Sequence, residues 1–225
     1  APPAPAPAAD ADVFEADYAV QLGGLRLGAL AFRVARAEGR YAASGAARSA
    51  GATAWLFSFR ADGTAEGAVD DATPRPERFA VDGAFGDERR RMIWRFDPHP
   101  AVEATPPFRS RADDPEPASL RGALDPLSAA AAALAPIPVA AAGKRTIAVY
   151  DGRRRVDLRI DAAEPTTGGG LRARAEARPA AGFKATHLRR GPFPITLRWD
   201  VADGLATLSR AEAPTGFGPV LLTRL

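Results

Sequence analysis

The sequence contains no cysteine. Disulfide bonds, thiolate nucleophiles and thiolate metal ligands are therefore excluded, although the redox compartment stays open. Histidine is nearly as scarce, since the two copies, His99 and His187, lie far apart in the sequence. A histidine-based metal site needs at least two such side chains and a carboxylate that converge. We therefore expect no metal and no cofactor.

Long hydrophobic runs are also missing. The apolar stretch from Ala129 to Ala142 is interrupted by Pro136 and Pro138. It is also shorter than the roughly 20 residues that a helix needs to cross a bilayer. The sequence therefore predicts no transmembrane segment.

Lysine occurs only at Lys144 and Lys184, so arginine carries nearly all of the positive charge. The 27 acidic residues almost cancel the 30 basic residues and leave a net charge of +3. The basic runs Arg89–Arg91 and Arg153–Arg155 stand beside turn signals and are interpreted as solvated hairpin ends. Nucleic-acid binding would need a basic face with aromatic stacking partners, so we expect no nucleic-acid partner.

Recognisable catalytic motifs are absent as well. The sequence has neither GxSxG nor HExxH, the arrangements that position a nucleophilic serine and a catalytic zinc. The acidic pairs Asp70-Asp71 and Asp113-Asp114 stand in proline-rich contexts and are interpreted as solvated. No catalytic residue is predicted and we expect no enzyme. A hydrolase with an unrecognised site is the remaining possibility in that class.

Residues 1–12 read APPAPAPAADAD and lack an initiator methionine. A proline- and alanine-rich tract favours a disordered lead with polyproline-like conformation. We interpret it as the mature N-terminus that remains after removal of a signal peptide, which predicts an exported, periplasmic protein. An arbitrary chain boundary is the alternative.

The clearest helix signal begins at Asp125. An aspartate followed by Pro126 suits the cap and the first position of a helix, and Leu127 to Ala135 continue it as an alanine-rich segment. Pro136 and Pro138 end it. The sequence therefore predicts one short helix here.

The sharpest hairpin signal follows directly. Apolar residues two apart flank the pair Asp151-Gly152, which is typical of two antiparallel strands joined by a tight turn. The flanking residues are Ile147, Val149, Val156, Leu158 and Ile160.

The same two-residue alternation recurs along most of the chain. It predicts a meander over 14–22, 25–34 and 41–50, a strand over 54–60 that turns at Asp62-Gly63, and further strands over 78–82, 91–96, 171–178, 195–201, 205–211 and 220–225. A Pro-rich loop is predicted at 97–122. The whole is expected to be mainly β: residues 13–225 form a single antiparallel open β-barrel or β-spiral of about a dozen strands with one short helix.

Aromatic residues alternate along several of these strands. One interpretation is that they fill the core. The other is that a curved sheet leaves them lining an apolar cavity, as small barrels that hold one hydrophobic ligand do. The candidate cavity-lining, ligand-binding residues are Trp55, Phe57, Trp94, Phe96 and Trp199.

Four short motifs carry a resemblance to a known family. They are Tyr18 with the segment Gly24–Gly28, the helix start Asp125-Pro126-Leu127-Ser128, Tyr150-Asp151-Gly152 followed by Arg155-Val156-Asp157-Leu158, and Gly182-Phe183-Lys184. Together they resemble the DUF3108 family of exported bacterial proteins from about Phe14 onward. The resemblance implies a periplasmic, mostly β protein with an open-barrel or spiral sheet and no established chemistry. It supplies no catalytic residues.

We therefore expect a non-enzymatic periplasmic protein of the cell envelope. In the leading hypothesis its curved sheet binds an apolar, lipid-like ligand. In the alternative it is a scaffold for protein–protein interaction in cell-envelope integrity, which uses sheet edges and the 97–122 loop to bind an envelope protein.

Overall fold

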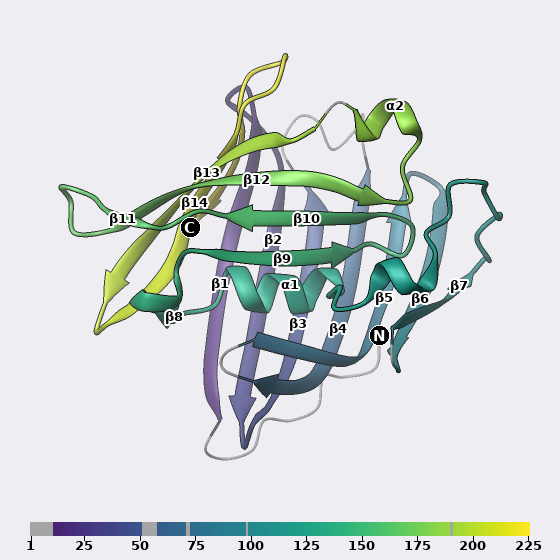
Figure 1. Cartoon of the computed structure of the whole chain (residues 1–225), viewed down its shortest axis with the longest axis horizontal. Coiled ribbons are helices and arrows are strands. Elements are labelled where there is room, and N and C mark those ends of the chain that lie inside the picture. The colour runs from purple at the N-terminus through teal and green to yellow at the C-terminus, as the bar shows by residue number, and fades with distance from the viewer. Residues whose placement is uncertain (1–10, 51–57, 71–72, 98, 190) are drawn as a thin grey trace.

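The computed structural model describes residues 11–50, 58–70, 73–97, 99–189 and 191–225. These residues form one antiparallel sheet (Figure 1). In chain order its strands are β1 (Asp12–Leu22), β2 (Leu25–Ala37), β3 (Arg40–Ser49), β4 (Phe59–Asp70), β5 (Thr73–Phe85), β6 (Glu88–Phe96), β7 (Pro100–Thr105), β8 (Ile137–Pro138), β9 (Arg145–Tyr150), β10 (Arg155–Ile160), β11 (Glu164–Pro165), β12 (Leu171–Ala181), β13 (Phe193–Ala202), β14 (Leu205–Ala213) and β15 (Val220–Arg224).

The spatial order of the strands is β7-β6-β5-β4-β3-β2-β1-β15-β14-β13-β12-β10-β9, with β11 paired to β12 and β8 to β14. The two end strands, β7 and β9, do not pair with each other within the described residues. The sheet is therefore an open barrel. In Figure 1 the long strands β1–β6 stand at the back, while β9, β10 and β12 cross in front of them. The predicted mainly β, single antiparallel open barrel is confirmed.

Helix α1 (Pro126–Ala133) lies inside the barrel (Figure 1) and contacts β3, β4, β5 and β9. The Asp125 side chain caps it by accepting the backbone N–H groups of Leu127 and Ser128, each at 2.9 Å. The predicted helix and the predicted 147–160 hairpin, now β9 and β10, are both confirmed. The structure adds α2 (Ala185–Leu188), a single turn, and the 3₁₀ turns η2 (Pro117–Leu120) and η3 (Val139–Ala141).

Two glycines make room for α1. Gly45 of β3 and Gly63 of β4 are register partners. A Cβ built on Gly45 would lie 2.6 Å from Cδ2 of Leu127, and one built on Gly63 would lie 3.3 Å from Cδ1 of the same leucine. The prediction of a turn at Asp62-Gly63 is therefore wrong. The glycine serves the packing of a helix residue against the middle of β4, and the strand continues through it.

The predicted loop at 97–122 contains a strand. β7 begins at Pro100, pairs only with β6 among the described residues, and so forms an edge, where a residue without an N–H is tolerated. Because β7 is only six residues long and begins with proline, its alternation of side chains gave no clear strand signal in the sequence. Further on, Leu120 of η2 is buried in the core. The segment is therefore partly integrated into the fold.

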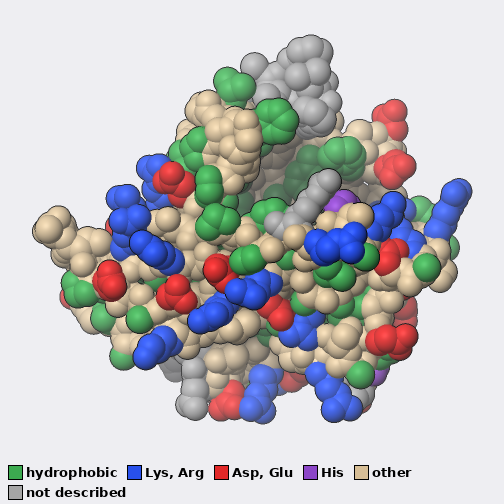
Figure 2. All heavy atoms as spheres, turned by 45° about the horizontal axis from the view of Figure 1, so that its top comes forward, with side chains coloured by type: hydrophobic (Ala, Val, Ile, Leu, Met, Phe, Trp, Pro, Cys, Tyr) green, Lys and Arg blue, Asp and Glu red, His purple; other side chains and the backbone are tan. Residues whose placement is uncertain are grey.

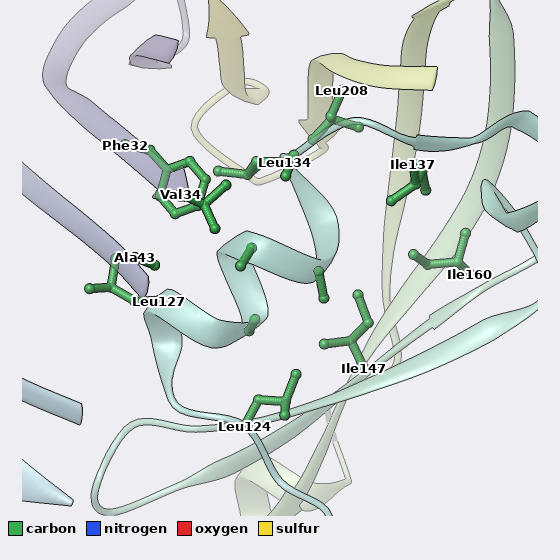
Figure 3. Close-up of a cluster of buried hydrophobic side chains, with 14 of the residues drawn as sticks. Phe32, Val34, Ala43, Leu124, Leu127, Leu134, Ile137, Ile147, Ile160 and Leu208 are labelled. Carbon is green, nitrogen blue, oxygen red and sulfur yellow. The ribbon is translucent and has the colours of Figure 1, made fainter. Parts of the chain in front are cut away.

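The hydrophobic core surrounds α1. Figure 3 shows the helix between side chains of the first strands, Phe32, Val34 and Ala43, and those of the later strands, including Ile147 and Ile160. Small alanines on the helix are fully buried, which lets both walls of the barrel approach its backbone. The alanine-rich sequence therefore suits a helix with protein on several sides.

Both ends of α1 are fastened to the sheet. At its N-terminal end Ser128 donates its hydroxyl to the Asp125 carboxylate, and the Tyr41 hydroxyl of β3 lies 2.6 Å from the Ser128 Oγ. At its C-terminal end the Arg36 guanidinium of β2 donates to the carbonyl oxygens of Ala131, at 3.1 Å, and of Pro136, at 3.4 Å. A cation suits that end of a helix. These contacts fix the helix along the barrel wall.

A Tyr41→Phe variant tests the first of these contacts. Because Ser128 already donates to Asp125, the Tyr41 hydroxyl is the donor to Ser128, and its loss is expected to lower the free energy of unfolding by about 1 kcal/mol. Urea denaturation measures the change. Tyr150→Phe is the matched control, since Tyr150 is also buried but its hydroxyl has no hydrogen-bond partner among the described residues. Equal losses in both variants would contradict the assignment.

Candidate functional site

The predicted ligand-binding aromatics lie in different environments. Trp94 and Trp199 are only 1% and 2% exposed and belong to the core. Phe96 is half-buried and packs against the same core. Trp55 and Phe57 lie outside the described residues. The two buried tryptophans therefore fill the core, the first of the two interpretations, and the hollows described below are lined by other residues.

Trp94 is packed between Phe79 and the β9–β10 turn. Its ring centroid lies 4.6 Å from that of Phe79 on the neighbouring strand. A Cβ built on Gly152, in the β9–β10 turn, would lie 2.9 Å from the indole Cζ2 and 3.6 Å from Phe108. Gly152 also has a φ of +96°, a conformation that side-chain-bearing residues rarely adopt. The turn therefore closes directly over the tryptophan.

One end of the barrel is left unfilled by the helix. We call it the open end; it carries the β1–β2 turn, the β5–β6 turn and the β14–β15 loop, at the top of Figure 1. Inner-face apolar side chains here are only half-buried, in contrast to Phe32 and Val34 beside α1. They are Leu30, Val81, Met92, Leu158, Ile195 and Leu222, from six different strands.

The strand register places these side chains on the inner face. Leu30 is two residues from buried Phe32 and so lies on the same face of β2. Val81 pairs with Gly63, which Leu127 of α1 contacts from inside, and Met92 pairs with Val81. In the second wall Leu158 pairs with buried Ile147. Figure 2, in which the top of Figure 1 comes forward, shows hydrophobic side chains gathered around a hollow at this end. The barrel therefore has an apolar interior that is accessible from one end.

Large hydrophobic side chains also stand exposed at the edge of the open end. Phe217 of the β14–β15 loop is 87% exposed, and Leu25 after the β1–β2 turn is 65% exposed. Phe59 and Phe85, which pair with each other across β4 and β5, are exposed as well, as is Phe193 at the start of β13. Scattered exposed apolar residues are ordinary, whereas an apolar patch around one opening is typical of interaction sites in general.

A cavity of about 350 Å³ lies at the side of the open end, between the β5–β6 turn and the β9–β10 turn. We call it the seam pocket. Its apolar lining is Phe59, Phe85, Met92 and Phe108, with the backbone of 83–84, and its charged lining is Glu88, Arg90, Arg111, Asp151, Arg153 and Arg154. Met92 belongs both to this pocket and to the apolar interior. The two spaces are therefore adjacent.

Phe108 organises the seam pocket. The guanidinium carbon of Arg90, on β6, lies 4.6 Å from the centre of its ring, and that of Arg153, in the β9–β10 turn, lies 4.2 Å from it. Such contacts attract a cation to the face of the ring. Arg153 also donates to the carbonyl oxygen of Arg109 at 2.9 Å. One aromatic ring thus joins the two sides of the opening through two arginines.

The interpretation of both arginine runs as solvated hairpin ends is therefore wrong for several of their members. Arg90 and Arg153 stack on Phe108, and Arg155 is partly buried, bound to the carboxylate of Asp157 at 2.7 Å and to the carbonyl of Ser119 at 2.5 Å. The sequence held one signal for this arrangement. Phe108 is a lone aromatic in a polar, proline-rich segment, where a large apolar side chain needs a partner.

A second hollow, of about 670 Å³, lies on the outer face of β1–β6. Its lining includes Glu15, Arg33, Asp62 and Asp82, which alternate with inward-facing residues along their strands. Arg33 is paired with Glu15 at 2.6 Å, and Arg48 with Asp62 at 2.9 Å. Exposed pairs of this kind contribute little energy. Apart from Phe32 and Leu225 the lining of the outer hollow is charged, polar or small. The outer hollow is therefore less suited to an apolar ligand than the open end.

Arg145 brings positive charge toward the barrel interior. It stands on the same face of β9 as buried Ile147, and it pairs in register with buried Ile160. Its Nε and Nη2 atoms are buried without a hydrogen-bond partner among the described residues. Burial lowers the pKa of this guanidinium, because the charged form loses solvation.

Within the described part of the chain, no group of three or more histidine, aspartate or glutamate side chains is arranged so that it could hold a metal ion. Among the same residues no helix has the length and apolarity needed to cross a bilayer.

The fold and the site together define an open antiparallel β-barrel that contains a helix and has an apolar, arginine-flanked mouth. The family model "Protein of unknown function (DUF3108)" matches residues 17–168. The chain belongs to the DUF3108 family, and the resemblance inferred from the four motifs is confirmed.

Among solved structures, the chain is similar to one described as "Crystal Structure of Beta-barrel-like Protein of Domain of Unknown Function DUF1849 from Brucella abortus". The similarity covers 94% of each chain, with 13% sequence identity and a TM-score of 0.47. No curated protein matches the chain significantly.

Proposed function

We propose that this protein is a non-enzymatic, periplasmic protein of the cell envelope that binds an apolar, lipid-like ligand in the open end of its barrel. The observation that carries the proposal is the set of half-buried apolar side chains on the inner face, beyond the reach of α1. Ligand sites are typically concave, mostly apolar and already formed before the ligand arrives.

Two further features support this proposal. Exposed phenylalanines and leucines stand around the opening, where an entering apolar chain would meet them first. The half-buried apolar side chains reach the surface at the same end of the barrel (Figure 2), so that a ligand can enter there without breaking a strand pair.

Filling the hollow tests the proposal. Ala47 of β3 pairs with Leu30 and so faces the interior, whereas its neighbour Ala46 lines the outer hollow. Ala47→Trp is expected to weaken binding of the neutral fluorescent probe N-phenyl-1-naphthylamine by about tenfold or more, because an indole would occupy the space that the probe needs. Ala46→Trp is the matched control and should leave the affinity within about twofold.

Fluorescence titration of the purified protein measures both affinities. Wild-type protein that does not bind the probe, or two variants that lose affinity equally, would contradict an apolar site inside the barrel. The periplasmic location is tested separately, by fractionating cells that express the full gene product; recovery from the cytoplasm would contradict it.

An interaction scaffold is the second candidate, and one observation favours it. The outer edge of β7 has no strand partner among the described residues. An extended segment of a partner could pair with it. Such an edge is short and begins with proline, which limits the ladder that a partner could add.

A further inference from the structure

The arginines of the seam pocket are not matched by carboxylates. Arg153 has an ion pair with Asp114, at 3.5 Å. Within the described ranges Arg90, Arg111 and Arg154 have none. The pocket therefore gathers cationic side chains of which three have no direct carboxylate partner among the described residues.

The acidic residues that line the pocket offset only part of this positive charge. The Asp151 carboxylate accepts the backbone N–H groups of Arg153, at 2.8 Å, and Arg154, at 2.7 Å. Its negative charge remains, because backbone N–H groups carry no charge. Glu88 stands exposed at the β5–β6 turn. The arginines that line the pocket, Arg90, Arg111, Arg153 and Arg154, thus outnumber its carboxylates, Asp151 and Glu88, and leave an excess of positive charge.

The guanidinium groups are also partly fixed in position. Arg90 and Arg153 are both held against Phe108, and the Arg154 guanidinium carbon lies 5.4 Å from the centre of the Phe183 ring. A planar guanidinium that lies over a ring keeps its edge N–H donors available. Those of Arg153 are partly used by Arg109 and Asp114, whereas those of Arg90 and Arg154 have no hydrogen-bond partner among the described residues. Carboxylates and phosphates are the groups that such donors bind best.

The apolar part of the pocket gives the anion a second requirement. Phe59, Phe85 and Met92 lie beside the arginines, and Met92 continues into the apolar interior. A small inorganic anion would make no contact with these apolar side chains, and a neutral hydrocarbon would make no hydrogen bond to the arginines.

We infer that the seam pocket binds the anionic head group, a carboxylate or a phosphate, of an amphiphile whose hydrocarbon tail lies in the barrel interior. This inference rests on the proposed function and adds the class of ligand: a single-tailed or double-tailed lipid with a negative head. The arginines select the head group, and the half-buried apolar side chains take the tail.

The test compares two probes that differ only in the head group. Wild-type protein and an R111Q/R154Q variant are titrated at neutral pH with cis-parinaric acid and with its methyl ester, which has no negative charge. Both arginines are exposed and without ion pairs among the described residues, so their replacement leaves the core intact. R172Q/R174Q, on the outer face of β12, is the control with the same change of net charge.

The acid is expected to bind R111Q/R154Q at least about tenfold more weakly than wild type, because hydrogen bonds to a charged group are lost. The ester should bind both proteins within about twofold, and the control variant should match wild type for both probes. For wild-type protein alone, added salt should weaken the binding of the acid and leave the binding of the ester unchanged. This second measurement does not depend on any variant's folding.

The contrary outcomes separate the two levels of the proposal. If the ester binds and the acid shows no dependence on the arginines or on salt, the head-group inference is overturned and the apolar site stands. If neither probe binds wild-type protein, the proposed function fails and the inference with it. If inorganic phosphate binds as tightly as the acid, the pocket is a site for a free anion, and the inference that its ligand is an amphiphile is overturned.

Discussion

Replacing Leu127 by alanine is expected to lower the free energy of unfolding by about 2–5 kcal/mol, the usual range for truncating a buried leucine. Leu127 is buried at the start of α1 and its Cδ atoms rest on the glycines of β3 and β4. Because glycines have no side chain that could move into the space, the cavity would stay largely open. The loss should therefore lie in the upper part of that range.

Urea denaturation and the thermal midpoint measure this effect. For a chain of this size each kcal/mol shifts the midpoint by about 2–4 °C. Leu25→Ala is the matched control, since Leu25 is 65% exposed and its truncation should change stability little. A Leu127→Ala protein as stable as this control would show that α1 is not an integral part of the barrel.

The second large effect is a pH dependence of stability that originates at Asp125. Its carboxyl is completely buried, and burial raises its pKa to about 6, against the opposing effect of hydrogen bonds from Ser128 and Leu127. In the unfolded chain the value is about 3.9. The folded state therefore binds a proton more tightly than the unfolded state does.

The sign follows from that difference. The stabilising contribution is complete below about pH 4, is lost as the pH rises toward 6, and is absent above it. The free energy of unfolding should fall across this window by about 3 kcal/mol, to within a factor of two. Raising the pH from 4 to 7 thus weakens the protein through this one group.

Asp125→Asn provides the comparison. Asparagine also caps helices, since its carbonyl oxygen accepts the same backbone N–H groups, but it does not titrate. The stability of wild type minus that of the variant, measured by urea denaturation from pH 4 to 8, should decrease through the window and then stay constant. A difference that is flat with pH would contradict a raised pKa at Asp125.

The local elements of this fold could be predicted from sequence. Helix α1 follows from a capping aspartate, a proline at the first position and prolines beyond its end. The β9–β10 hairpin follows from Asp151-Gly152 between alternating apolar residues. Both signals depend only on neighbours in the chain, and such signals survive folding when the tertiary environment agrees with them.

Features that depend on residues far apart in the chain were harder to predict from the sequence. Asp62-Gly63 has the composition of a turn, yet Gly63 stands in mid-strand because Leu127 packs on it from the helix. Similarly, Trp94 and Trp199 carry the same alternation whether they fill a core or line a cavity. Periodicity assigns a face to a side chain, but it does not reveal what occupies the space in front of that face.

The seam pocket illustrates the same limit. Arg90 and Arg153 are far apart in sequence and meet only because Phe108 lies between them. Each arginine run, taken alone, is ordinary for the end of a hairpin. Only the tertiary fold brings the two runs to opposite sides of one opening, so their combined charge had no sequence signal beyond the isolated phenylalanine.

The pairing of β1 with β15 has a consequence for how the chain folds. Along the main strand order the other neighbours are close in sequence, so their hairpins can form quickly and independently. The β1–β15 ladder, with Tyr18 opposite Arg224, instead closes a loop that contains all the remaining strands, β2 to β14. The entropy lost in that closure comes before its contacts stabilise anything. The strands β1–β7 and the strands β9–β15 would therefore form first as two separate halves of the sheet. The rate at which β1 then pairs with β15 would limit the rate at which the barrel folds.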